Sequence, residues 1–307
     1  MRWCLLLLAG LSAGQTTTSG IRVDGALVFR DVEVLAADDM EGRQTGTEGS
    51  RRARAYLLTR FEAVGVARIG GSFERPFRFT PRNGQPQTGT NVVGVIRGTR
   101  DPDRYIVVTA HYDHIGTRNG VVFNGADDNA SGVAVLLAVA AHFARQRPEH
   151  SILVAALDAE ESGLHGATAL LEDPPVPVSS MVVNVNLDMV GRDADNRLFA
   201  SGLHHAPFLR PYLEDAAQPP VRLIFGHDTP GDRQDWTQDS DHFPFHQAGI
   251  PFVYFGVEDT QHQHRATDDA ATIGREFLAG AAGTVIAAVR QLDAGLDRIA
   301  THRTKPR

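Results

Sequence analysis

Three short aliphatic runs constrain the fold of this chain more than any other feature of its sequence. They cover residues 105–110, 151–157 and 181–187 and read YIVVTA, SILVAAL and MVVNVNL. Runs of this length, rich in Val and Ile and without clean polar alternation, indicate strands buried on both faces of an α/β sheet. Ligands of such sheets bind beyond the carboxyl ends of the strands. The residues that follow the three runs are therefore the first candidates for a functional site.

A histidine or an acidic residue follows each run directly. His111 follows the first run, the sequence Asp-Ala-Glu-Glu at 158–161 follows the second, and Asp188 follows the third. A fourth polar stretch, GADDNASG at 125–132, lies between the first two runs and leads into an apolar helix predicted over 132–143. We expect these four segments to bring His, Asp and Glu side chains to one edge of the sheet.

Helix capping is the structural explanation for the polar residues before that helix. Asp127, Asp128, Asn129 and Ser131 are all residue types that cap helix N-termini. Capping accounts for one of the two consecutive aspartates but not for both.

Length and composition indicate a single globular unit without a nucleic-acid partner. The chain has 307 residues, of which 42% are hydrophobic, and it shows no repeat and no long linker. Alternating strands and helices predict one three-layer α/β domain over residues 15–300. The net charge of −7 and the lack of a Lys/Arg cluster argue against nucleic-acid binding.

The N-terminus is typical of a short secretory signal. Arg2 precedes an apolar run over 3–11, and the small residues Ser12, Ala13 and Gly14 follow it. We expect a signal peptide over 1–14, too short to span a membrane, and a secreted or periplasmic protein. Residues 301–307 form a basic tail.

Periodicity predicts the remaining elements. The expected helices cover 50–64, 163–171, 206–217 and 273–292. The expected strands cover 73–80, 91–96, 221–225 and 250–256, with 73–80, 91–96 and 105–110 forming a meander. Residues 25–33 are weakly patterned and receive no element, and 226–245 are expected to form a long functional loop.

The residue types at the strand ends are those of a zinc hydrolase. Zinc takes His and carboxylate ligands and keeps a position for water, and two zinc ions about 3.5–4 Å apart can act on one substrate. Such a pair needs a bridging carboxylate with a His and an acidic residue for each metal. Residues of these types are His111, Asp128, Glu161, Asp188 and His264. Glu160 is left over, and because adjacent residues leaving a strand point apart, it is the candidate general base.

The sequence resembles the di-zinc aminopeptidases of metallopeptidase family twenty-eight from about Leu35 to its last helix. The matching motifs are HYDH at 111–114, GADDNASG at 125–132, DAEESGLHG at 158–166, NLDMVGR at 186–192, SDHFPF at 240–245 and HRATD at 264–268. Together these motifs are highly specific, whereas each alone is weak. The resemblance implies a mixed, eight-stranded sheet between helix layers.

The resemblance also implies a role for each metal-binding residue. His111 and Asp188 are expected to bind one zinc ion, and Glu161 and His264 the other, with Asp128 bridging the two.

The residues around the metals receive roles in the same way. Glu160 is expected to be the base, Asp113 to orient His111, and Asp268 to orient His264. Many family members have Tyr before the last histidine, where it helps to stabilise the oxyanion, but this chain has Gln263. That role is unassigned, and Tyr254 or a second zinc contact are its candidates. His114, Asp241 and His242 lie in the motifs without a role that sequence reasoning supplies.

The implied activity is that of an aminopeptidase. A water bridging two zinc ions would attack the N-terminal peptide bond of a peptide substrate, with Glu160 as the base. A carboxypeptidase stays an alternative because Arg192, Arg233 and Arg265 lie in suitable loops for a substrate carboxylate. A glutaminyl cyclase, which resembles a single-zinc enzyme, is another. A receptor-like module without metal is disfavoured because all the ligand residues and the base are present.

Overall fold

The computed structural model describes residues 21–81 and 84–303. The expected signal peptide over 1–14 and the last four residues of the basic tail lie outside the described residues, so the signal and export stay predictions. Across the part of the chain that is described, no helix combines the length and apolar character that crossing a bilayer requires.

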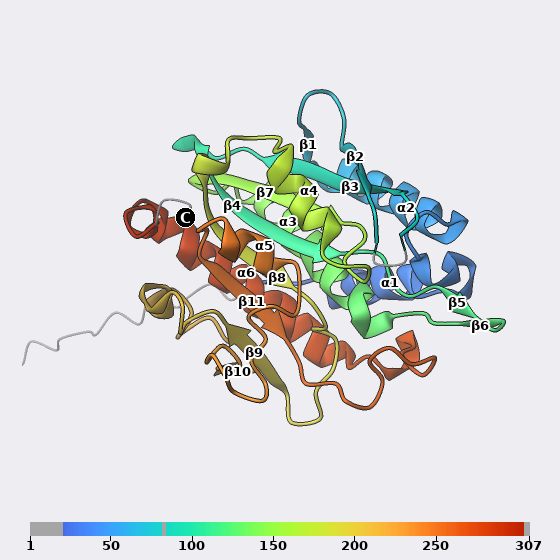
Figure 1. The fold of residues 1–307 in the computed structure, drawn as a ribbon. Coiled ribbons are helices and arrows are strands. Elements are labelled where there is room, and N and C mark those ends of the chain that lie inside the picture. Colours follow the sequence, from blue (N-terminus) through green and yellow to red (C-terminus); the bar gives the residue numbers. More distant parts are fainter. Residues whose placement is uncertain (1–20, 82–83, 304–307) are drawn as a thin grey trace, which may run out of the picture.

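One mixed sheet forms the centre of the molecule (Figure 1). Among the described residues it has nine strands, in the order β1-β3-β7-β4-β8-β11-β9-β10, with β2 paired to β3. The strands are β1 (Ala67–Arg68), β2 (Glu74–Phe79), β3 (Gln87–Ile96), β4 (Asp101–His111), β7 (His150–Leu157), β8 (Met181–Leu187), β9 (Arg197–Ser201), β10 (Arg222–Phe225) and β11 (Phe252–Gly256). The mixed α/β architecture is confirmed, with nine strands in place of the expected eight. The short strands β5 (Thr117–Arg118) and β6 (Val121–Val122) form a separate hairpin.

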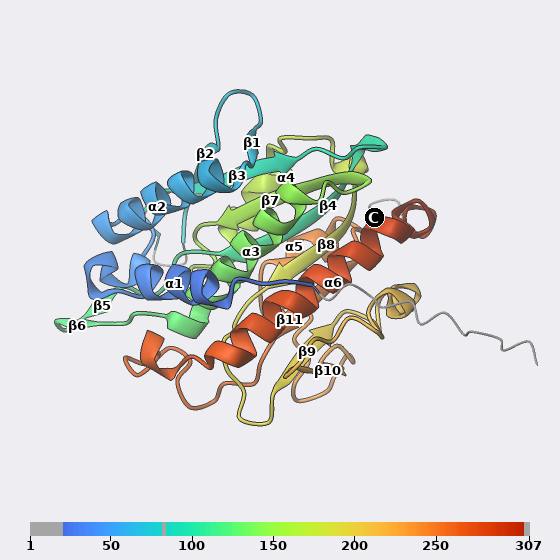
Figure 2. The ribbon, with the colours of Figure 1, turned by 180° about the vertical axis from the view of Figure 1, so that it is seen from behind.

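Helices cover both faces of the sheet. They are α1 (Gly25–Leu35), α2 (Glu48–Val64), α3 (Gly132–Arg145), α4 (His165–Glu172), α5 (His242–Gln247) and α6 (Arg275–Ala300). Figure 2 shows α1, α2, α3 and α6 in front of one face, and they contact one another in a layer. The shorter α4 and α5 pack together on the opposite face.

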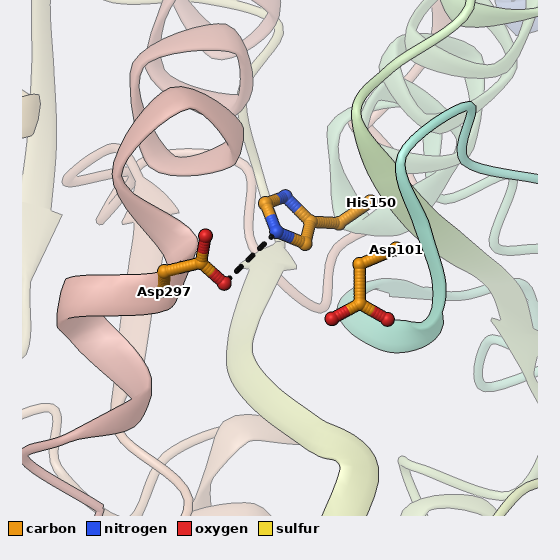
Figure 3. Close-up of side chains that lie close together, drawn as sticks. All are labelled: Asp101, His150 and Asp297. Atoms are coloured by element: carbon orange, nitrogen blue, oxygen red, sulfur yellow. Dashed lines mark hydrogen bonds and ion pairs between the residues drawn. The ribbon is translucent and has the colours of Figure 1, made fainter.

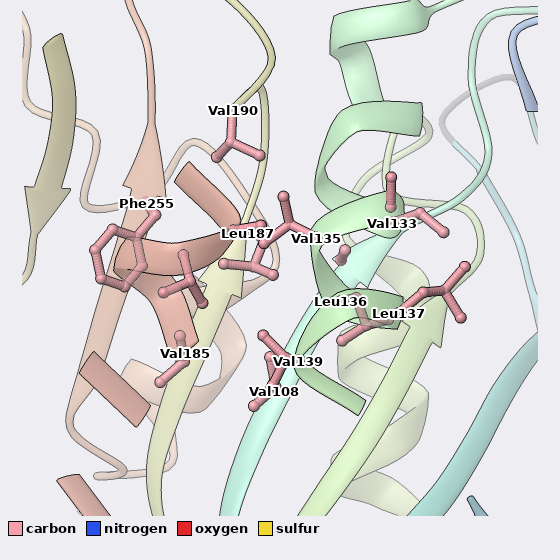
Figure 4. Packing of buried hydrophobic residues seen from close by; sticks show 14 of the residues in the cluster. Val108, Val133, Val135, Leu136, Leu137, Val139, Val185, Leu187, Val190 and Phe255 are labelled. Atoms are coloured by element: carbon pink, nitrogen blue, oxygen red, sulfur yellow. The ribbon is translucent and has the colours of Figure 1, made fainter. Parts of the chain in front are cut away.

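The central strand β4 shows why the aliphatic runs lack polar alternation. Ile106 and Val108 belong to the hydrophobic cluster of the α3 and α6 side, whereas Tyr105 and Val107 belong to the cluster of the α4 and α5 side. Figure 4 shows valines and leucines of α3 beside Val108 of β4 and beside Val185 and Leu187 of β8, and α3 contacts both strands. Because both faces are covered, apolar residues follow one another without alternation over 105–108, as predicted.

Helix α1 forms where the sequence analysis assigned no element. Asp24 caps it by accepting a hydrogen bond from the Leu27 amide at 3.1 Å. Its buried residues Val28, Val32 and Leu35 lie at spacings of three and four. This spacing is the signature of an amphipathic helix, so the signal was present in the sequence.

The predicted meander is wrong at its third strand. β2 and β3 form an antiparallel pair, but β7 lies between β3 and β4. The connection at 97–100 crosses the beginning of β7, where the Gly98 amide donates to Ser151 Oγ at 3.0 Å and the Arg100 amide to the Glu149 carbonyl at 2.9 Å. A short link between strands does not require them to be neighbours when it can bond to a strand that intervenes.

The helix expected at 206–217 is also mostly wrong. Only a short 3₁₀ helix forms, at Pro207–Tyr212, and Pro211 lies inside it. Proline removes a backbone donor and disfavours a continued α-helix. The strand β9 just before it was not predicted.

Candidate metal centre

The parallel strands β4, β7, β8 and β11 end at one edge of the sheet. His111 is the last residue of β4, Glu160 and Glu161 lie in the turn after β7, and Asp188 follows β8 directly. His264 lies in the loop after β11. The structure therefore brings the sequence-predicted residues together, because parallel strands end at the same edge of the sheet, as the prediction assumed.

His111, Asp188 and Glu160 form one group of donor atoms. His111 Nε2 lies 3.3 Å from Asp188 Oδ1 and 3.5 Å from Asp128 Oδ1. Donor atoms of His111, Glu160 and Asp188 all lie within 4.8 Å of one another. Within the described chain, the Glu160 carboxylate has no hydrogen-bond partner, so it remains available to other groups.

His264, Glu161 and Asp128 form a second group beside the first. His264 Nε2 lies 3.0 Å from Glu161 Oε2 and 3.1 Å from Asp128 Oδ2. His114, which sequence reasoning left without a role, joins this group, with its Nδ1 atom 2.6 Å from Glu161 Oε1. Its position in the HYDH motif was the only signal that could have indicated it.

Asp128 lies between the two groups and faces both. Its Oδ1 atom is the one near His111, and its Oδ2 atom is the one near His264. A carboxylate that offers one oxygen to each of two neighbouring donor groups is arranged as a bridging ligand.

The Asn129 side chain, and that of neither aspartate, binds the first amide of α3, whose N-cap residue is Ser131. The Oδ1 atom of Asn129 accepts from the Gly132 amide at 3.0 Å and its Nδ2 atom donates to the Leu187 carbonyl at 2.9 Å, which ties the loop to the end of β8. Asp127 accepts from the Gly191 amide at 2.7 Å and from Ser131 Oγ at 3.0 Å. Asp127 therefore holds two loops together, and Asp128 is left to face the donor groups.

Asp113 supports the site through its backbone as well as its side chain. The His111 Nδ1 atom lies 3.1 Å from the Asp113 carbonyl and 3.7 Å from its carboxylate. The carboxylate itself accepts from the amides of Glu160 at 3.1 Å and Glu161 at 3.4 Å. One residue thus fixes both the first imidazole and the turn that carries both glutamates.

Asp268 was expected to lie beside the His264 imidazole, but it contacts other groups. Its oxygens accept from the amides of Asp127 at 2.9 Å and Asp128 at 3.0 Å, and from Arg192 at 2.7 Å. It therefore orients the loop of the bridging residue. The correction has a simple cause, since two adjacent amides at a loop bind both oxygens of one carboxylate.

Arg43 is a fully buried arginine that sequence reasoning missed. Its guanidinium donates to the carbonyls of Tyr112, Leu35, Asn124 and Gly125 at 2.6–2.9 Å. Burial lowers its pKa to about 10, against the opposing attraction of nearby carboxylates. All these contacts are with backbone, so Arg43 fixes the loops around the site without forming an ion pair with the acidic residues.

The acidic residues of the site face histidines, not the side chains of Arg or Lys. Within the described residues, no Arg or Lys forms an ion pair with Asp128, Glu160, Glu161 or Asp188. Burial and the neighbouring Glu161 raise the pKa of Asp128, and burial raises that of Glu160 well above its usual range. Contacts with Asp128 and Glu161 raise the pKa of His264 to about 10. This is the electrostatic environment of a site that is built for cations.

The donor set fits zinc. Ligands at about 2.0–2.2 Å from a tetrahedral metal lie about 3.3–3.6 Å from one another. The distances from His111 to Asp128 and Asp188, and from His264 to Asp128 and Glu161, run from 3.0 to 3.5 Å. The Glu161 Oε1 atom is buried without a hydrogen-bond partner among the described residues, as expected where a cation is the missing partner.

A cavity of about 500 Å³ opens onto the site. Besides the residues of the two donor groups, Met189, Trp236, Asp239, Tyr254 and Gln263 line it. It has no Arg or Lys among its lining residues, and the three arginines named for a carboxypeptidase lie outside it.

A third group of His and acidic residues lies at the opposite end of the sheet. Asp101, His150 and Asp297 approach one another at the beginning of β4 and β7 (Figure 3). Arg100 lies 2.8 Å and Arg104 lies 2.6 Å from Asp297, so this group is an ion-pair network.

The fold and the two donor groups define a zinc peptidase class. The sequence model of Peptidase family M28 matches residues 91–289. The chain belongs to this family.

Proteins of similar sequence include zinc metalloproteases and an aminopeptidase. A probable zinc metalloprotease of Pyrenophora tritici-repentis is 31% identical over 221 residues, 59% of this chain and 49% of the relative. Aminopeptidase YwaD of Bacillus subtilis is 32% identical over 215 residues, 66% of this chain and 44% of the relative. The chain thus spans about half the length of the curated relatives it matches.

Solved structures share the fold. An aminopeptidase from Aneurinibacillus sp. strain AM-1 superposes with a TM-score of 0.70 at 16% identity, covering 88% of this chain and 94% of that one. A glutaminyl cyclase of Porphyromonas gingivalis gives a TM-score of 0.71 at 19% identity, covering 87% and 98%. At these identities the likeness establishes the fold alone.

Proposed function

We propose that the chain is a two-zinc aminopeptidase that releases N-terminal residues from peptides. The observation that carries the proposal is the position of Asp128, whose two oxygens face two different donor groups. One cation would be held by His111, Asp128 and Asp188, and the other by Asp128, Glu161 and His264. Bound there, the two zinc ions would polarise the scissile carbonyl and lower the pKa of a water molecule.

Glu160 is the residue that we propose as the general base and acid. Its carboxylate lines the cavity, lies near His111 and Asp188, and has no hydrogen-bond partner in the described chain. Asp113 fixes its backbone, so the side chain is directed by a rigid turn. Glu160 takes the proton of the attacking water and returns it to the leaving amine.

The charge of the cavity supports an aminopeptidase over a carboxypeptidase. A carboxypeptidase needs a cation to hold the terminal carboxylate of its substrate, and among the described residues no Arg or Lys lines the cavity. Arg192 is bound to Asp259 and Asp268, and Arg233 lines a neighbouring cavity. A substrate with a free ammonium group matches this cavity.

Asp239 is the anchor that we propose for that ammonium group. It lines the cavity, and its carboxylate makes no hydrogen bond or ion pair within the described residues. The other acidic residues of this wall are engaged: Glu258 lies 3.4 Å from Arg197, and Asp259 lies 2.6 Å from Arg192. Among the described residues that line the cavity, Asp239 is thus the one carboxylate outside the two donor groups that forms no ion pair.

The test is a panel of substrates that differ at their ends. We expect hydrolysis of aminoacyl nitroanilides and of C-terminally amidated peptides, and none of the same peptides with an acetylated N-terminus. Cleavage of N-acetylated peptides from their C-terminus would establish the carboxypeptidase. Release of pyroglutamyl peptide from an N-terminal glutamine substrate, with one zinc per chain, would establish the cyclase.

A further inference from the structure

His114 is a buried histidine whose ring nitrogens have no hydrogen-bond partner. It is 1% exposed and lies in the loop after β4. Neither Nδ1 nor Nε2 makes a hydrogen bond within the described residues, and the facing Glu161 Oε1 atom makes none either. Leaving such groups unpaired in the interior costs about 1–3 kcal/mol each, so a partner from outside the chain is expected at this point.

The ring is held in place against the donor group of the second cation. Its Nδ1 atom lies 2.6 Å from Glu161 Oε1 and 3.9 Å from Asp128 Oδ2. The first approach is close, but the two atoms are not aligned for a hydrogen bond. On the other side the ring packs on the backbone of Gly125, where an added Cβ would lie 2.5 Å from it. The imidazole therefore has little room to turn away from Glu161.

We propose that His114 is a ligand of the cation held by Asp128, Glu161 and His264. The assignment rests on the proposed two-zinc function and adds a residue to it. Donor atoms of His114, Asp128 and Glu161 lie within 4.8 Å of one another, so these three buried residues form a group without His264. His264 completes it from the loop after β11, with its side chain half exposed.

The two cation sites are then unequal. The site of His111 and Asp188 has three protein ligands, counting Asp128, whereas the site of His114 has four. Closed sites with four protein ligands are typical of structural zinc, and sites with three keep a position for water or substrate. The four-ligand cation is retained when the other exchanges, and the three-ligand cation is the one that meets the substrate.

The experiment measures bound metal in the purified full chain. Wild-type protein and the variants His114→Ala, His264→Ala and His150→Ala are dialysed against a zinc buffer, and zinc per chain is determined by mass spectrometry. We expect two equivalents in the wild type and in His150→Ala, which removes a buried imidazole at the opposite end of the sheet. We expect His114→Ala to lose one equivalent, with a fall in affinity beyond the about 10–100-fold of removing an outer hydrogen-bonding partner.

A second variant tests contact with the metal directly. In cobalt-substituted His114→Cys, a thiolate bound to the metal gives a charge-transfer band in the near ultraviolet that the cobalt-substituted wild type lacks. This band supports the proposal even if His114→Ala does not fold. Its absence, or two equivalents of zinc in His114→Ala with an unchanged cobalt spectrum, overturns the proposal. One equivalent in the wild type would instead overturn the two-zinc function itself.

Discussion

The two ends of strands β4 and β7 carry the same residue types and use them differently. At the beginning of β7, His150 lies among Asp101, Asp293 and Asp297 (Figure 3). At the other end, His111 lies among Asp128, Asp188 and Glu160. Clusters of His and carboxylates thus occur twice on one sheet.

Positive charge separates the two clusters. Arg100 and Arg104 pair with Asp297 at the beginning of the strands, whereas no Arg or Lys among the described residues pairs with the four inner carboxylates at their ends. Proximity of ligand types alone therefore does not identify a metal site. The informative feature is a buried acidic cluster that, within the described residues, forms no ion pair with Arg or Lys.

Removal of metal should reveal the largest difference between the two clusters, because only the cluster at the strand ends is expected to bind a cation. A chelator is expected to abolish activity, and added zinc to restore it, because no Arg or Lys among the described residues pairs with the acidic residues at the strand ends. The melting temperature should fall as well, since a ligand at a thousand times its Kd contributes about 4 kcal/mol to stability. Activity in nitroanilide hydrolysis and thermal unfolding are the measurements. An enzyme that keeps full activity in the chelator contradicts the assignment.

Glu160→Gln should retain both cations and lose activity. A general base contributes about 10²–10⁴ in rate, and the amide cannot accept the proton. The turnover number and the zinc content are measured together. Glu172→Gln, an exposed change at the end of α4, is the control and should be fully active. Equal turnover in Glu160→Gln would exclude Glu160 as the base.

Asp293→Ala should weaken the fold and leave the metal in place. Asp293 accepts from the amides of Glu149 and His150 and from His150 Nδ1, at 2.8–2.9 Å. We expect the free energy of unfolding to fall by about 2–3 kcal/mol, because the partners are buried. Denaturant unfolding and zinc content test this. Asp297→Ala, one turn further along α6 and exposed, should have a smaller effect. Loss of zinc in Asp293→Ala would show that the two clusters are coupled.

Cation affinity should rise with pH. The carboxylates of Asp128 and Glu161 raise the pKa of His264 to about 10, so without a cation its imidazole holds a proton at neutral pH. A cation must displace that proton, so affinity should fall by about tenfold per pH unit for each proton displaced as pH decreases. Zinc titrations between pH 6 and pH 8 in metal buffers measure the slope. A pH-independent affinity would contradict a protonated His264.

Asp239→Asn should have the smallest effect. It removes the unpaired carboxylate of the cavity wall without touching either donor group. Loss of a solvent-accessible ion pair with the substrate ammonium costs about 1 kcal/mol, which corresponds to about a fivefold rise in KM. Steady-state kinetics on one aminoacyl nitroanilide test it, with the exposed Asp232→Asn as the control. An unchanged KM would place the ammonium elsewhere.

The sequence was sufficient to predict the core of the site because a residue that directly follows a buried parallel strand must lie at one known edge of the sheet. Parallel strands end at one edge, so His111, Glu161 and Asp188 could be placed together from the residues that follow aliphatic runs. The central strands were predicted for the same reason, since burial on both faces leaves a continuous apolar pattern.

The rest of the site depends on packing that the sequence does not encode locally. Asn129, Arg43 and Asp268 act through backbone groups, and any loop offers amides and carbonyls. The place of β7 between β3 and β4 is equally non-local. The orientation of His114 toward Glu161 depends on the close approach of Gly125, which only coordinates reveal.

Arg43 connects the region ahead of the family match to the edge of the sheet that carries the proposed site. A fragment trimmed to residues 91–289 would contain every proposed ligand and the base. It would nevertheless lack the guanidinium that ties the carbonyls at 112, 124 and 125 to one another. Such a fragment would keep the proposed ligands but lose the hydrogen bonds that fix the loops carrying them. The segment that defines the family is therefore shorter than the segment needed to hold the proposed site.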